Sequence, residues 1–144
     1  GPRGVGKASF ALAAAERVLA EAAGPPISLP GLDTPEDHRI AVHNVTGSAD
    51  ALRLLAMYDY TVVISDMGRG EDRLAGLRLA GQMRASGDRT PLIIYTVRPD
   101  GAAAQQAQRE MVAEAGAQGV VVTPQDVRAV ILKLFGNPRP RPPA

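Results

Sequence analysis

The chain has 144 residues, of which 45% are hydrophobic and only 3% are aromatic. This length fits one domain with an aliphatic core. The net charge is +1 and cysteine is absent, so bulk charge predicts neither a nucleic-acid nor a membrane partner, and disulfides and thiolate metal sites are excluded. No apolar run reaches the roughly 20 residues that a membrane-spanning helix needs. We therefore expect a cytoplasmic protein.

The first part of the chain predicts a helix and a long connection. Residues 1–7 (GPRGVGK) are glycine-rich, and we expect a flexible terminus there. Residues 8–23 carry apolar side chains at helical spacing, which predicts an amphipathic helix ended by the Gly-Pro-Pro of residues 24–26. Residues 25–38 hold four prolines and predict a connection, with at most a short extended piece at 27–29.

From residue 39 onward, predicted strands and helices alternate. The strands are expected at 39–45, 61–65, 91–95 and 119–122, and the helices at 48–58, 74–85, 101–115 and 124–135. This order predicts an α/β fold with an open, mainly parallel sheet and helices on both faces. The folded domain is then 8–135, and residues 136–144 (GNPRPRPPA) predict a proline-rich tail.

Three polar residues directly follow predicted strands. Asp66 follows 61–65, Thr96 follows 91–95, and Thr123 follows 119–122. Functional groups of open parallel sheets collect at the carboxyl ends of the strands, so these three residues form the candidate site. Thr123 has a second interpretation as the N-cap of the next helix, because Pro124 and Asp126 suit the N1 and N3 positions.

The same segments resemble the receiver domain of bacterial response regulators, which has a flavodoxin/CheY-like fold. TVVISDMGRG resembles the third strand, TPLIIYTV the fourth and EAGAQGVVVTP the fifth. The resemblance covers residues 39–135. It implies Asp66 as phosphoacceptor with Thr96 and Thr123 beside it, Mg²⁺ held near Asp66 and Gly68, and a sensor histidine kinase or other signalling protein binding residues 101–135.

The sequence departs from the receiver pattern in two places. Receivers begin with a strand that ends in an acidic pair for Mg²⁺, and no strand is predicted before residue 39. The lysine that follows the fifth strand in receivers is replaced by Thr123. Phosphoryl transfer needs metal and cationic groups to offset charge, so a phosphorylated receiver and a degenerate, non-enzymatic interaction module both remain open. An absent first strand would be replaced by 27–29, by closure of its neighbours, or by a partner chain such as a second copy.

A competing motif lies at the amino terminus. GPRGVGK matches the G-x-x-x-x-G-K core of a P-loop, with Gly6 and Lys7 at its end, and a helix is predicted to follow. Residues 61–66 would then be a strand ending in the metal-associated Asp66. Against this, Ala8 occupies the position of the Mg²⁺-binding Ser or Thr. The alternative function is therefore a P-loop nucleotide-binding fragment that uses Lys7 and Asp66.

Overall fold

A computed structural model of the chain describes residues 16–22, 27, 40–67 and 74–136. Within them, five strands form one parallel sheet: β1 (Glu16–Glu21), β2 (Ile40–Val45), β3 (Val62–Asp66), β4 (Leu92–Tyr95) and β5 (Gly119–Val121). Their order across the sheet is β2-β1-β3-β4-β5, with every pairing parallel. The predicted open parallel sheet is confirmed.

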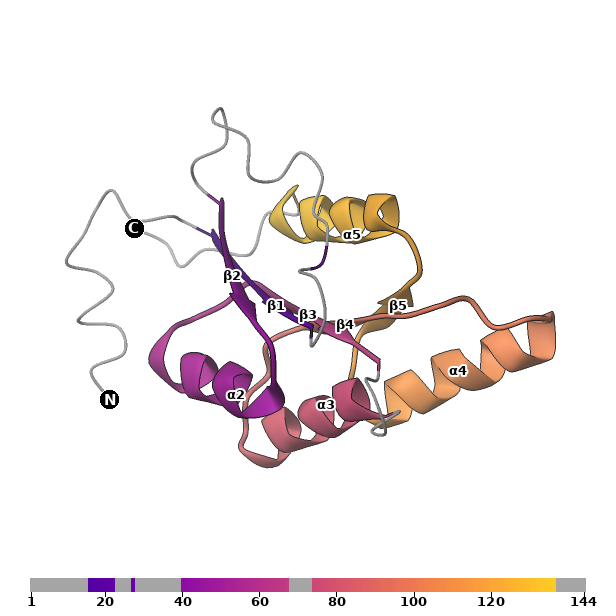
Figure 1. The fold of residues 1–144 in the computed structure, drawn as a ribbon, viewed down its shortest axis with the longest axis horizontal. Helices are drawn as coiled ribbons and strands as arrows, with labels where there is room; N and C mark the ends of the chain where they lie inside the picture. The colour runs from indigo at the N-terminus through magenta and orange to yellow at the C-terminus, as the bar shows by residue number, and fades with distance from the viewer. Residues whose placement is uncertain (1–15, 23–26, 28–39, 68–73, 137–144) are drawn as a thin grey trace, which may run out of the picture.

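Helices cover both faces of this sheet, as the β-α alternation predicts. They are α2 (Ser48–Met57), α3 (Ala75–Ala85), α4 (Ala102–Glu114) and α5 (Pro124–Gly136). In Figure 1, α5 lies on one face, and α2, α3 and α4 lie on the other. Each face has its own apolar core. Leu19 and Val63 pack with α2 and α3, whereas Val18 and Ile64 pack with α5.

The first strand is present, and the prediction that it is missing was wrong. Residues 16–21, which the helical spacing assigned to a helix over 8–23, form β1 between β2 and β3. Val18, Leu19 and Ala20 are buried on alternate faces. A strand buried on both sides is a continuous apolar run, and this burial outweighs the helix propensity of alanine. No replacement strand is needed, and Ile27 packs into the α5-side core outside any strand.

The other predicted elements agree with the structure to within two residues at their ends. Residues 1–15, 28–29 and 137–144 lie outside the described residues, so the predicted flexible terminus and the proline-rich tail are not part of this description. Among the helices that are described, none combines the length and hydropathy required to cross a bilayer.

Candidate functional site at the carboxyl ends of the strands

The carboxyl ends of β3, β4 and β5 bring together the residues that the sequence singled out. Asp66 is the last residue of β3 and pairs with Tyr95 of β4. The backbone N–H of Met67 donates to the Tyr95 carbonyl at 3.1 Å, and that of Thr96 donates to the Val121 carbonyl at 3.0 Å. Asp66 and Thr96 therefore lie at adjacent strand ends, and both are partly exposed.

Glu21, at the end of β1, is the site residue that sequence reasoning missed. It pairs in register with Ser65 of β3, and the Ser65 hydroxyl donates to Glu21 Oε1 at 2.6 Å. Both residues are 0% exposed. A signal was present in the sequence, because the short apolar run 18–20 is followed by this single acid, two alanines and then a Gly-Pro-Pro break.

The carboxylates of Glu21 and Asp66 belong to opposite faces of the sheet. Side chains alternate along a strand, so Ser65 shares the α2–α3 face with Val63, and its partner Glu21 points to that face as well. Asp66 takes the alternate position, on the face of Ile64. The residue after Glu21 is Ala22, which is buried in the apolar core beneath α5. The residue that follows β1, on the face that Asp66 occupies, is thus apolar.

This arrangement does not fit the Mg²⁺ site that the receiver resemblance implies. The acidic pair of receivers would hold Mg²⁺ through carboxylate oxygens that converge on one point, with water completing the octahedral geometry. Glu21 is buried against Ser65, and Ala22 has no oxygen on its side chain. Across the residues that the structure describes, no three acidic, histidine or cysteine side chains form a metal-binding group. Gly68, the other predicted metal position, lies outside them.

Gly76 brings the start of α3 close to the candidate site. Its backbone N–H donates to the Met67 carbonyl at 2.7 Å. A Cβ atom built on Gly76 would lie 2.3 Å from the Asp66 carbonyl oxygen and 2.9 Å from Ile94 Cδ1. Real Cβ atoms do not approach a backbone oxygen so closely, so only glycine permits this contact between α3 and the end of β3.

Thr123 has the geometry of a helix cap. Its Oγ1 accepts a hydrogen bond from the Asp126 backbone N–H at 3.0 Å, which is the N-cap to N3 contact that satisfies a free donor in the first turn of α5. The Thr123 hydroxyl therefore caps α5, and it stands at the position where receivers have their lysine.

The P-loop alternative finds no support in the fold. Gly6 and Lys7 lie outside the described residues, and the helix expected after them does not extend over residues 16–21, which form β1.

No protein-family model matches this sequence, and the comparison with curated proteins finds no match either. Solved structures do match. The receiver domain of Francisella response regulator 1452 has a TM-score of 0.66 at 18% identity, over 84% of this chain and 97% of that chain. The chemotaxis response regulator CheY4 of Vibrio cholerae gives 0.64 at 18% identity, over 83% and 98%.

A third similar structure is the response regulator TrrA of Thermotoga maritima in complex with Mg²⁺ and BeF, with a TM-score of 0.60 at 20% identity, over 83% of this chain and 98% of that chain. The match extends over nearly the whole of each of these three chains. The chain therefore has the fold of the CheY-like receiver domains.

Proposed function

We propose that the protein is a receiver-like signalling module that acts by binding another signalling protein, without Mg²⁺-dependent phosphorylation of Asp66. The observation that carries this proposal is the buried contact between Ser65 and Glu21. This contact holds the Glu21 carboxylate, at the end of β1, on the face of the sheet opposite Asp66. Transfer of a phosphoryl group to a carboxylate requires metal and cationic groups around the transferring oxygens, and Ala22 and Thr123 supply neither.

The surface we assign to partner binding is residues 101–135, which include α4, β5 and all of α5 except its last residue. Val112 is the one residue of α4 that is buried, and Met111 beside it is 46% exposed. In Figure 1, the amino-terminal half of α4 projects beyond the sheet. A helix with so little contact to its own domain has a large surface free for a partner, and we propose a sensor histidine kinase or a related signalling protein.

Incubation with acetyl phosphate and Mg²⁺, followed by intact-mass measurement, tests the chemical half of the proposal. The protein is expected to show no phosphoryl adduct, while circular dichroism confirms that it is folded. The matched variant is Asp66→Ala. An adduct on the wild-type chain that is absent from this variant would show that Asp66 is a phosphoacceptor and would overturn the proposal.

Binding to the phosphotransfer domain of a sensor histidine kinase tests the other half. Met111→Glu introduces a charge on the exposed face of α4 and is expected to weaken binding, whereas Asp66→Asn is expected to leave the Kd unchanged. Loss of binding in Asp66→Asn, with Met111→Glu unaffected, would contradict both the surface and the phosphorylation-independent mode. Absence of binding by the wild-type protein would rule out this class of partner.

A further inference from the structure

Three aromatic rings form a cluster on the α2–α3 face, away from the candidate site. They are His43 of β2, Tyr58 directly after α2, and Tyr60 before β3. The Tyr60 hydroxyl and His43 Nδ1 are 2.7 Å apart. The His43 ring meets Tyr60 and Tyr58 edge to face, with centroids 5.5 and 5.7 Å apart. This aromatic cluster joins the edge strand β2 to the segment that leads into β3.

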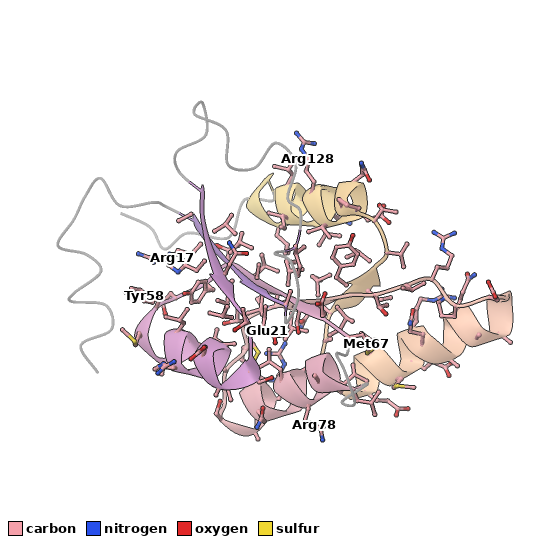
Figure 2. The ribbon with its side chains drawn as sticks, in the orientation of Figure 1. Arg17, Glu21, Tyr58, Met67, Arg78 and Arg128 are labelled. Atoms are coloured by element: carbon pink, nitrogen blue, oxygen red, sulfur yellow. The ribbon has the colours of Figure 1, made fainter. Side chains whose placement is uncertain are left out.

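Positive charge lies beside the cluster. The Arg17 guanidinium of β1 is 5.3 Å from the centre of the Tyr58 ring, and it donates to the Asp59 carbonyl at 3.5 Å. Figure 2 shows Arg17 next to Tyr58, apart from Glu21. Strand β1 carries two charged residues on this face: Arg17 lies beside the cluster, and Glu21 lies further along the strand. From the segment between α2 and β3, the titratable groups are Tyr58, the exposed Asp59 and Tyr60.

These surroundings favour the neutral form of both hydrogen-bonded partners. Burial, with a smaller contribution from the Arg17 charge, lowers the pKa of His43 below its usual 6.5. Burial raises the pKa of Tyr60 to about 12. At neutral pH the Tyr60 hydroxyl therefore carries its proton, and His43 has one nitrogen able to accept it.

We propose that His43 is a proton-sensitive latch between β2 and the chain entering β3. In the closed state, the Tyr60 hydroxyl donates to Nδ1 of neutral His43. When Nδ1 takes a proton from solvent, it can only donate, so the Tyr60 hydroxyl must turn its own proton away and accept from Nδ1–H. The resulting imidazolium then lies partly buried near the like charge of Arg17. This regulation is separate from the proposed signalling function and from Asp66.

Strand β2 is the element that this latch controls. Among the strands that the structure describes, it lies at one edge of the sheet and pairs with β1 alone. Each side-chain contact that ties β2 to the rest of the domain therefore carries a larger share of its stability than the same contact on a central strand. Protonation of His43 is expected to loosen β2 first.

The sign of the pH dependence follows from linkage. His43 has a lower pKa in the folded chain than in the unfolded chain, so the unfolded chain binds more protons between the two values. Stability from the neutral ring is complete above about pH 6.5 and is lost as the pH falls through the folded pKa. Thermal unfolding at about pH 7.5 and about pH 5.5 spans this interval.

The unfolding experiment compares the wild-type chain with His43→Gln and with His38→Gln, which removes the other histidine. A fall in Tm on acidification is expected in the wild type and in His38→Gln, and a smaller fall in His43→Gln. An equal fall in His43→Gln, or a fall that disappears in His38→Gln instead, would overturn the proposal.

Imidazole ¹⁵N NMR measures the protonation state and the tautomer of His43 directly in the wild-type chain, so this test does not depend on how a variant folds. The expected result is a neutral His43 with its proton on Nε2 and a pKa below 6.5. Tyr60→Phe removes the donor that favours the neutral ring, so it should raise this pKa. A proton on Nδ1 at neutral pH, or a His43 pKa at or above 6.5, would contradict the latch.

Discussion

Two side-chain hydrogen bonds lie on the same face of the sheet but differ in their burial. Ser65 to Glu21 spans 2.6 Å at the carboxyl ends of β1 and β3, and Tyr60 to His43 spans 2.7 Å beside the edge strand. The lengths are almost equal, but Glu21 and Ser65 are fully buried, whereas His43 is partly exposed. Removing the hydrogen-bond partner of a polar group that water cannot reach lowers the stability of the fold, because the group is left unsatisfied. Burial thus makes the first contact structural and leaves the second able to respond to pH.

We expect the largest effect from breaking the close packing between α3 and the end of β3. Gly76→Ala places a Cβ atom 2.3 Å from the Asp66 carbonyl oxygen, so either α3 or the end of β3 must move. We expect a loss of about 3 kcal/mol in the free energy of unfolding, at the upper end for overpacked sites. Denaturant unfolding followed by circular dichroism measures it.

The matched control for this variant is Gly81→Ala in the same helix. No atom lies within 4 Å of a Cβ built there, and replacing glycine by alanine inside a helix is expected to stabilise by up to about 1 kcal/mol. The two substitutions are chemically identical and should have opposite signs. A loss of similar size in both would show that the close approach of α3 to Asp66 is not the cause.

The sequence predicted the strands from residue 40 onward but missed the strand before them. The strands from residue 40 onward are short β-branched runs between turn signals, and their order was enough to place Asp66 and Thr96 at neighbouring strand ends. Strand β1 was missed because an alanine-rich segment satisfies the helical spacing equally well. Its true state is decided by burial on both faces, which is a property of the assembled sheet and not of the segment.

Both side-chain contacts were beyond the reach of sequence reasoning for the same reason. Glu21 and Ser65 are 44 residues apart, and His43 and Tyr60 are 17 apart. Their encounter depends on the register of β1 against its neighbours. Once β1 had been assigned to a helix, no local pattern could bring either pair together. The capping role of Thr123, by contrast, is local, and the sequence suggested it as one of two interpretations.

Ser65→Ala is expected to have the intermediate effect. It removes the hydroxyl that donates to the buried carboxylate of Glu21, and a buried acceptor that loses a donor costs about 2 kcal/mol. The double variant Ser65→Ala with Glu21→Leu removes both polar groups, so it should recover part of this loss. If Ser65→Ala unfolds at the same denaturant concentration as the wild type, the contact does not hold β1 to β3.

Tyr60→Phe makes the same deletion, of one hydroxyl, at the other contact. We expect a loss of about 1 kcal/mol at neutral pH, typical of a single neutral hydrogen bond, because the partly exposed His43 can exchange its lost donor for water. Denaturant unfolding of Tyr60→Phe and Ser65→Ala under one set of conditions tests the ranking. A larger loss in Tyr60→Phe would mean that the edge strand depends on its latch more than the centre of the sheet depends on Glu21, and burial would then not be what separates the two contacts.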